Sequence, residues 1–437
     1  MKAEGPRGTL ERGLRLGRLG LTLTGSYLGY QFQRLWLDEA EQSRRREGLQ
    51  RNASRRVREE LGLLKGPMMK IGQLVSMQSH ALPEAAMAEL ASLQMQAPGM
   101  HATLARAQFK SSLGRYPEEL FRTFEPEPFA AASLGQVHRA VSKRGERLAV
   151  KIQYPAIREA VQNDFKLLRS ATLPGRLTGH APASIFDEVQ RGFLEETDYL
   201  HEGANIDFFR EALREYGYLD LPRVHRDLTT ERVLTMSFVE GLHIADWLRT
   251  RPGQGLRDLV GARLFEQFNV QIARVQALHA DPHPGNYLLR EDGRIGLVDF
   301  GCVKRLTPDV EELNWRLVSR SWLEGPAQME RVIGLLWGPH VSRPKARRMM
   351  TDLGGYIDLV FPRGPDAGVV DFGKPTILNS LSQAMRRAVS DKLTNPEFAF
   401  VSRAELGLYC LLHQLRARVK TTEVWEGVQQ RDGGRKM

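Results

Sequence analysis

The sequence predicts an α+β fold in which a small β-rich lobe is followed by a helical lobe. Short strand-like runs flank a turn at 142–145, another lies at 232–239, and helical patterning dominates beyond Gly241. The 437 residues, 42% hydrophobic and 26% charged, have a globular composition and suffice for two or three compact units. The segments we expect are 1–45, a helical extension over 46–125, the β-rich lobe over 126–240 and the helical lobe over 241–437.

The first segment, residues 1–45, contains an uncharged stretch from Leu19 to Gln33 that follows several arginines. It lacks the cleavage site of a signal peptide, and it is too short and too polar to span a bilayer, which needs about 20 mainly apolar residues. Its aromatic residues, such as Tyr27 and Trp36, suit a membrane interface. A helix packed on the protein's own body is an equal alternative.

The net charge is +10, from 62 Lys and Arg against 52 Asp and Glu, and suggests anionic partners such as membrane surfaces or phosphate-bearing ligands. The sequence has no RNA-binding aromatic motif and no zinc-finger spacing, so we expect no nucleic acid. Only Cys302 and Cys410 occur, which suits a reducing cytosolic compartment.

In the helical extension, Pro67 suits the first turn of a helix that reaches about Leu82. Lys70 and Gln73 lie three residues apart and share one face of this helix. The β-rich lobe begins with a hairpin whose second strand carries Lys151. The elements we expect from the hairpin onward are strands at 129–141, 146–154, 232–239, 287–289 and 295–298 and helices at about 156–170 and 184–213.

Two motifs in the helical lobe carry the chemistry. Residues 279–286 read His-Ala-Asp-Pro-His-Pro-Gly-Asn, and residues 297–301 read Leu-Val-Asp-Phe-Gly. Phosphoryl transfer requires one carboxylate near the nucleophile and an Asn with a second carboxylate to hold magnesium. Asp281 fits the first role, and Asn286 and Asp299 fit the second.

Two structural alternatives concern the first motif. Asp281 beside Pro282 could simply cap a turn. His279 and His283 are four residues apart, as zinc ligands on a helix would be, but Pro282 and Pro284 are incompatible with that helix. The phosphoryl-transfer interpretation is therefore preferred.

We expect the nucleotide-binding residues in the β-rich lobe. Lys151 is placed to neutralise phosphates if an acidic residue on a neighbouring helix holds its amine, and Glu202 is our choice. A solvated helix face is the alternative for these acids. Kinases cover the phosphates of the nucleotide with a loop of spaced glycines. The loop at the equivalent place here, residues 130–136, is stiffened by three alanines and retains only Gly135. This composition predicts modest affinity or unusual geometry for the nucleotide. The remaining candidate nucleotide contacts are Ala130, Ala131, Ala132, Ser133, Gln136 and Met236.

Little chain separates the second motif from the next helix, because Thr307 and Pro308 suit the start of a helix. Protein kinases use the corresponding segment to seat peptides and to be switched by phosphorylation, so its brevity argues against an ordinary protein-kinase role. Position 283, two residues after Asp281, carries His where kinases usually have lysine. The positive charge that would assist the γ-phosphate is therefore missing or pH-dependent.

Together these motifs resemble the UbiB/AarF-type (ABC-one) atypical kinase-like family. The matching residues are Lys70 to Gln73, Ala130 to Gln136, Lys151, Glu196 to Asp198 with Glu202, Thr230 to Leu234, Asp281 to Asn286 and Asp299 to Gly301. The resemblance implies a bilobal protein-kinase-like fold with an N-terminal helical extension. It also implies that Lys70 and Gln73 meet Glu196 and Asp198 and occlude the place where a peptide would bind, through a charge-assisted pair that is poorly displaced.

The resemblance further implies Mg²⁺-dependent ATP hydrolysis or unconventional phosphotransfer that supports ubiquinone or other isoprenoid-lipid biosynthesis. The expected partners are ATP, Mg²⁺, an isoprenoid lipid or quinone precursor and an anionic membrane surface, with the protein cytoplasmic and peripheral to the inner face of a membrane. Two alternatives stay open. The motif at 279–286 also resembles the loop of aminoglycoside and choline kinases, which are small-molecule phosphotransferases, and the protein could also act as a nucleotide-gated scaffold for lipids or partners.

Overall fold

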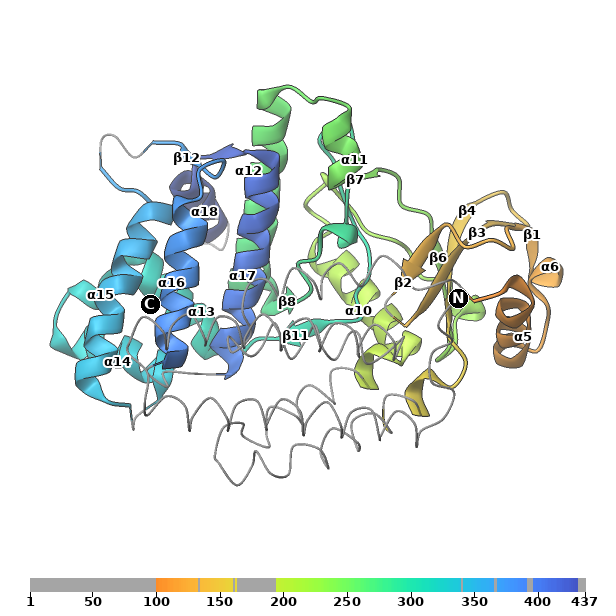
Figure 1. The fold of residues 1–437 in the computed structure, drawn as a ribbon, viewed down its shortest axis with the longest axis horizontal. Helices are drawn as coiled ribbons and strands as arrows, with labels where there is room; N and C mark the ends of the chain where they lie inside the picture. Colours follow the sequence, from red (N-terminus) through yellow and green to blue (C-terminus); the bar gives the residue numbers. More distant parts are fainter. Residues whose placement is uncertain are drawn as a thin grey trace, which may run out of the picture. The chain divides into compact units, whose positions relative to one another are not determined.

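The strands and helices are taken from a computed structural model that describes residues 100–132, 134–159, 162, 194–338, 341–364, 368–390 and 396–430 (Figure 1). The predictions for residues 1–99, which include Lys70 and Gln73, lie outside the described residues, as do Ser133 and most of the helix expected at 156–170. The predicted mixture of helices and sheets is confirmed.

The described chain divides into two units. Unit 1 comprises the described residues up to His201 together with His225–Met236, and unit 2 comprises Glu202–Val224 and the described residues from Ser237 onward. The four segments predicted from the sequence stay predictions.

Unit 1 is built on a sheet with the strand order β1-β3-β4-β6, and a further short strand, β2, pairs with β3. The strands are β1 (Phe121–Phe124), β2 (Ala130–Ala132), β3 (Gly135–Ser142), β4 (Arg147–Gln153) and β6 (Val233–Ser237). The predicted hairpin is confirmed, because β3 and β4 pair antiparallel with Val141 opposite Arg147. The run predicted as one strand at 129–141 is instead two strands, β2 and β3, that pair with each other.

One face of this sheet is covered by α5 (Ala102–Leu113), which is followed by α6 (Pro117–Leu120) (Figure 1). Phe109 of α5 is fully buried in a cluster with Phe121, Val150 and Ile152. Burying one such side chain contributes about 1.5–3 kcal/mol. The helix ends at Gly114, whose φ of 73° is a left-handed conformation that glycine adopts without strain. Apolar burial by α5 therefore fixes the sheet that carries Lys151.

Unit 2 contains three small sheets, of which the largest has the strand order β5-β10-β9-β7. Strands β9 and β10 confirm the predicted strands at 287–289 and 295–298 and pair antiparallel, with Leu297 opposite Tyr287. A second sheet pairs β11 with β8, and a third pairs β12 with β13. The strands are β5 (Leu219–Asp220), β7 (Leu242–His243), β8 (Ala277–His279), β9 (Tyr287–Leu289), β10 (Ile295–Leu297), β11 (Val303–Arg305), β12 (Val370–Asp371) and β13 (Arg418–Val419).

Helices form most of unit 2, and α12 packs against two of them, α17 and α18. Its buried side chains include Val260, Leu264 and Phe265, and α17 and α18 lie beside it (Figure 1). Gly261 permits close packing, because a Cβ there would lie 2.4 Å from that of Ala417. The helices are α10 (Tyr199–Ala212), which begins in unit 1, α11 (Ile244–Arg249), α12 (Gln254–Val270), α13 (Pro308–Ser319), α14 (Pro326–Trp337), α15 (Arg343–Val360), α16 (Thr376–Ser390), α17 (Pro396–Leu415) and α18 (Thr421–Gln430).

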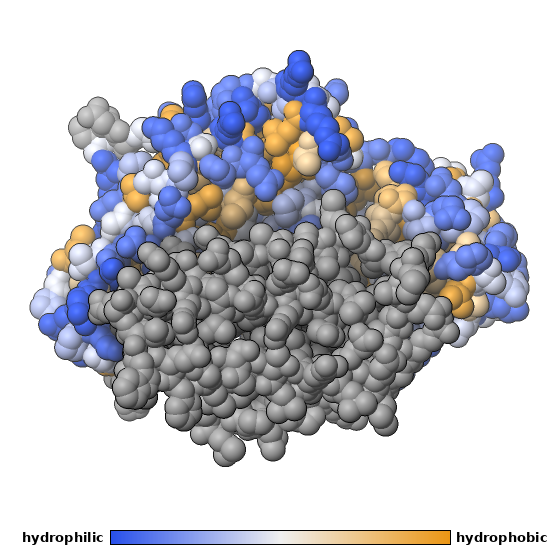
Figure 2. Space-filling view, in the orientation of Figure 1, coloured by the Kyte–Doolittle hydropathy of each residue, from blue (hydrophilic) through white to orange (hydrophobic). Residues whose placement is uncertain are grey.

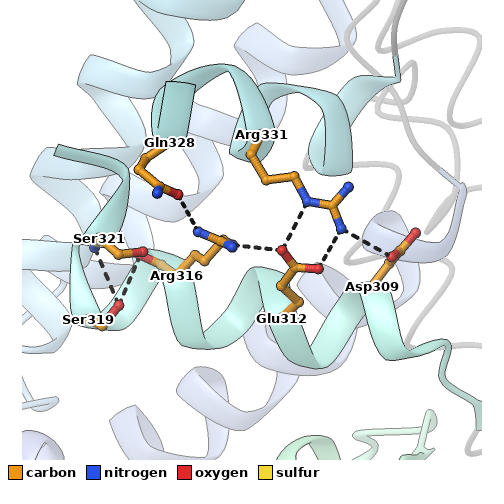
Figure 3. A network of polar contacts seen from close by, with 7 residues as sticks. All are labelled: Asp309, Glu312, Arg316, Ser319, Ser321, Gln328 and Arg331. Atoms are coloured by element: carbon orange, nitrogen blue, oxygen red, sulfur yellow. Dashed lines mark hydrogen bonds and ion pairs between the residues drawn. The ribbon is translucent and has the colours of Figure 1, made fainter. Parts of the chain in front are cut away.

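The helix predicted to start at Thr307 and Pro308 is confirmed as α13, with Thr307 at the N-cap position. A carboxylate on α13, Glu312, joins it to α14 (Figure 3). Arg331 donates to both carboxylate oxygens of Glu312, at 2.9 and 2.5 Å, and Arg316 Nε donates at 2.7 Å. The hydrogen bonds from Arg331, which have the largest effect, and from Arg316 lower the pKa of Glu312 to about 2.

The surface is mainly hydrophilic where the view in Figure 2 shows described residues, with smaller groups of hydrophobic side chains between. Large apolar side chains that are exposed include Leu242 and Leu259 in unit 2. Within the described ranges, every helix is too short or too polar to cross a bilayer.

Candidate functional site

The segment between β8 and β9 brings Asp281 and Asn286 together. Asn286 Nδ2 donates to Asp281 Oδ2 at 2.9 Å and to the Asp281 carbonyl at 3.1 Å. A short 3₁₀ turn, Pro284–Asn286, closes the segment, and Gly285 N donates to His283 Nδ1 at 3.0 Å. Because the amide nitrogen of Asn286 faces Asp281, its oxygen is the atom that it can offer to a cation.

Asp299 is tied to the strand that precedes Asp281. His279 Nε2 lies 2.7 Å from the carbonyl oxygen of Asp299, and a carbonyl only accepts, so this ring nitrogen carries the hydrogen. Strand β11 pairs with β8, which places Val303 opposite His279. His279, for which the sequence analysis considered a zinc role and argued against it, therefore links the two predicted motifs.

Asp299 itself has a left-handed backbone, with φ of 67°. Asp tolerates this region better than most residues, and its Oδ1 accepts a hydrogen bond from Gly301 N at 3.2 Å in an Asx turn. Such backbone conformations cost about 1–3 kcal/mol and occur preferentially at functional sites. The turn directs the chain from β10 toward β11.

Two side chains of helix α10 form hydrogen bonds with the backbone of Phe300, the residue after Asp299. Phe300 is fully buried, and its ring centroid lies 5.2 Å from that of His279. Its backbone nitrogen donates to Glu202 Oε1 at 3.3 Å, and its carbonyl accepts from Asn205 Nδ2 at 3.0 Å. Glu202 therefore supports the Asp299 turn, and its predicted pairing with Lys151 stays a prediction.

A π-helical turn, Gln271–Val275, continues α12 and orients one further side chain. Gln271 Oε1 accepts from His279 N at 2.7 Å, and the turn ends at Gln276, whose φ is 50°. Gln276 O in turn accepts from Leu306 N at 2.9 Å. A π turn holds one residue more than an α turn and is common at functional sites. Sequence patterning gave no sign of it.

The hydroxyl group closest in sequence to this loop is that of Tyr287. Burial raises its pKa, and the negative charge of Asp281 raises it further. The hydroxyl is therefore neutral at physiological pH and adds no negative charge beside Asp281.

In unit 1, Lys151 lies on β4 opposite Val137 and is only 6% exposed. Its Nζ lies 5.1 Å from the ring centroid of Tyr199, within cation–π range. Its neighbours along β4, Val150 and Ile152, pack in the cluster with Phe109 of α5, and successive residues of a strand point to opposite faces. Lys151 therefore points to the face opposite the one that α5 covers.

Gln136 points to the α5 face instead. Its Oε1 accepts from Met100 N at 2.7 Å, and its Nε2 donates to Met100 O at 3.3 Å and to His138 Nε2 at 2.9 Å. His138 Nδ1 donates to Glu125 O at 2.9 Å, and burial lowers the pKa of this ring, which favours the neutral form that accepts from Gln136. The side chain of Gln136 is thus occupied within unit 1, and its predicted nucleotide contact stays a prediction.

The alanines predicted as a phosphate loop form strand β2. Ala130, Ala131 and Ala132 pair with Val137, Gln136 and Gly135 respectively. Gly135 is required sterically, since a Cβ there would lie 2.2 Å from the Ile152 carbonyl oxygen. Met236 is buried on β6.

Asp198 caps a helix. Its Oδ1 accepts from Leu200 N at 2.9 Å and His201 N at 3.3 Å, at the start of α10. The prediction of one continuous helix over 184–213 is therefore wrong in its described part, because the helix is interrupted at 197–198. Glu196 is the last residue of the helical segment 194–196 that precedes this interruption. The predicted contact of Glu196 and Asp198 with Lys70 and Gln73 falls outside the described residues.

Comparisons with known proteins identify the family. The model of the ABC1 atypical kinase-like domain matches residues 92–324, more than half of the chain. A chloroplastic Arabidopsis thaliana protein, ACTIVITY OF BC1 COMPLEX KINASE 7, is 33% identical over 271 residues, 61% of this chain and 38% of that protein. The Mus musculus AarF domain-containing protein kinase 1 is 31% identical over 272 residues, 61% of this chain and 52% of that protein.

The chain thus spans about half or less of the length of these curated relatives. Among solved structures, the complex of Rv3197 with erythromycin from Mycobacterium tuberculosis has a TM-score of 0.60 and 26% sequence identity. The match covers 88% of this chain and 98% of the other.

Proposed function

Because the chain belongs to the ABC1 atypical kinase-like family, we propose that it uses Mg-ATP for hydrolysis or phosphoryl transfer. The observation that carries the proposal is the joining of the two motifs. Asn286 bonds to Asp281, and Asp299 is linked through its carbonyl to His279, on the strand that precedes Asp281.

The residue roles follow from donor chemistry. Asp281 is the carboxylate that orients the nucleophile and accepts its proton. Asp299 and the amide oxygen of Asn286 are hard oxygen ligands of the kind that Mg²⁺ prefers, so the donor set fits the ion. Bound there, Mg²⁺ would supply charge neutralisation to the transferred phosphoryl group.

The residues of unit 1 supply nucleotide binding in this proposal. Lys151 neutralises phosphate charge, and Glu202, which belongs to unit 2, is the acid proposed to hold its amine. The backbone of β2 and of Gly135 and Gln136 approaches the nucleotide, with Met236 as a further contact. The alanine side chains of β2 predict modest nucleotide affinity.

We further propose that the acceptor is not an ordinary protein. Seven residues, 301–307, separate Asp299-Phe300 from α13, which leaves little chain to seat a peptide. The family resemblance adds Lys70 and Gln73 as occluding residues that meet Glu196 and Asp198. It also supports a role in ubiquinone or other isoprenoid-lipid biosynthesis at a membrane surface.

A small-molecule acceptor is the second candidate. The solved structure from Mycobacterium tuberculosis is a complex with erythromycin, a small hydroxylated ligand, and matches most of this chain. Labelled phosphate found on a soluble alcohol or amine would favour this candidate over a lipid acceptor.

The test is Mg-ATP turnover by the full chain, with and without anionic liposomes that contain isoprenoid lipid, in wild type, Asp281→Asn and Asp299→Asn. Removal of a general base usually costs about 10²–10⁴ in rate. We expect turnover that rises with liposomes and falls by that amount in Asp281→Asn. Turnover also falls in Asp299→Asn, which loses a proposed magnesium ligand. Absence of turnover in wild type under all conditions, or full activity in Asp281→Asn, would contradict the proposal.

A further inference from the structure

Helix α17 contacts the residues on both sides of Asp281. Arg403 Nη2 donates to the carbonyl oxygen of Ala280 at 2.6 Å. One helical turn later, Gly407 packs against Pro282 so closely that a Cβ at Gly407 would lie 2.1 Å from the Pro282 Cβ. Residues four apart on a helix share a face, so both contacts come from one side of α17.

We propose, resting on the function proposed above, that α17 positions the carboxylate of Asp281, with Arg403 as a positioning residue. Helix α17 lies beyond residues 92–324, which the family model matches. The chain's C-terminal region therefore contributes to the geometry of the site.

The chemistry of Arg403 fits such a role better than a role in stability. Its Nε and Nη1 are shielded from solvent and have no hydrogen-bond partner in the part of the chain that the structure describes. A shielded donor without a partner costs about 1–3 kcal/mol, so the site is not optimised for stability. Phe400 provides a partial offset, because its ring centroid lies 5.7 Å from the Arg403 guanidinium, within cation–π range.

The loop needs such support because its backbone is not held by a regular helix or strand. Ala280 N donates to Cys302 O at 3.0 Å, and the Arg403 bond uses the carbonyl of the same residue. Both polar backbone groups directly before Asp281 are thus fixed, and Gly407 limits movement of Pro282 directly after it. A displacement of a catalytic group by about 1 Å can cost roughly 100-fold in rate.

The test compares full-length wild type with Arg403→Met, Arg403→Lys and Gly407→Ala. Arg347→Met, on the exposed face of α15, and Gly427→Ala, at an open position on α18, are the matched controls. We expect Arg403→Met to lower kcat for Mg-ATP turnover by roughly 10- to 100-fold with KM for ATP unchanged. Arg403→Lys retains a charged donor, so we expect a smaller loss of kcat than in Arg403→Met. In an Asp281→Asn background, we expect Arg403→Met to cause no further loss of kcat.

Hydrogen–deuterium exchange of the peptide that spans 279–286 gives a readout independent of activity. We expect faster exchange in Arg403→Met and Gly407→Ala and wild-type exchange in both controls. Unchanged exchange in those two variants would overturn the positioning role even if turnover is absent. A further loss of rate from Arg403→Met in the Asp281→Asn background would overturn it as well, because the residue would then act independently of Asp281.

Discussion

Replacement of Glu312 by Gln is expected to destabilise unit 2 by about 1–2 kcal/mol at pH 7. The pKa of Glu312 falls from its ordinary 4.5 to about 2, a difference of 4.5 − 2, or about 2.5. At about 1.4 kcal/mol per pKa unit, this corresponds to roughly 3 kcal/mol. Because the side chain of Arg331 is 52% exposed and water screens its charge, we retain about half of that value.

The effect depends on pH in a defined direction. A carboxyl group whose folded pKa is lowered contributes stability that is present above its unfolded pKa and is lost as pH falls through its folded pKa. The difference between wild type and Glu312→Gln should therefore be full above about pH 5 and shrink between pH 4.5 and about 2.

Urea unfolding followed by circular dichroism measures this difference at about pH 7, above that window, and at about pH 4 and about pH 3, within it. Glu211→Gln is the matched control, because Glu211 pairs with Arg214 at 2.9 Å but both side chains are more than 70% exposed. The control should change stability by less than about 0.5 kcal/mol. Equal losses in both variants, or a Glu312→Gln difference that does not shrink in acid, would refute the reasoning.

Three further predictions concern unit 1 and α17. Gly135→Ala should lower the melting temperature and weaken Mg-ATP binding, since the added Cβ would lie 2.2 Å from the Ile152 carbonyl oxygen; thermal unfolding with and without Mg-ATP measures both effects. Glu405→Gln should raise the melting temperature at pH 8 but not below about pH 4.5. Burial raises the pKa of Glu405, so the neutral carboxyl is the stabilising form and is lost as pH rises, whereas Gln stays neutral at every pH. Ala132→Gly should change the dissociation constant for Mg-ATP in titration calorimetry, because glycine frees the backbone of β2.

Each of these three has an outcome that would contradict it. An unchanged melting temperature for Gly135→Ala would mean that β3 and β4 separate readily enough to admit a methyl group. A lower melting temperature for Glu405→Gln at pH 8 would mean that the ionised carboxylate is the stabilising form. An unchanged dissociation constant for Ala132→Gly would count against a role of β2 in nucleotide binding.

Local signals in the sequence predicted much of the fold. The hairpin that carries Lys151 follows from two strand-like runs around a short turn, and the start of α13 follows from Thr307 and Pro308. Asp281 and Asn286 are five residues apart, so a single turn suffices to bring them into contact. In each case the chain segment that decides the geometry is short enough to be recognised in the sequence.

Side-chain partners that are distant in the sequence could not be predicted. Gln136 was assigned to a nucleotide loop, yet it bonds to Met100, 36 residues away, because the alternation of β3 directs it to the α5 face. Arg403 reaches Ala280 across 123 residues, and only the packing of α17 determines that contact. The π turn at Gln271–Val275 adds one residue to α12 without a change in composition that would reveal it.

The order of strands in unit 1 has a consequence for biosynthesis. Strand β4 has β3 on one side and β6 on the other, and β6 is encoded only after α10 and β5. A nascent or recombinant fragment that stops at His201 would leave β4 as an open edge, a common template for misassembly. The ribosome must therefore deliver the chain through residue 237 before this sheet can be completed, and any expression fragment of unit 1 has to carry the intervening helix along.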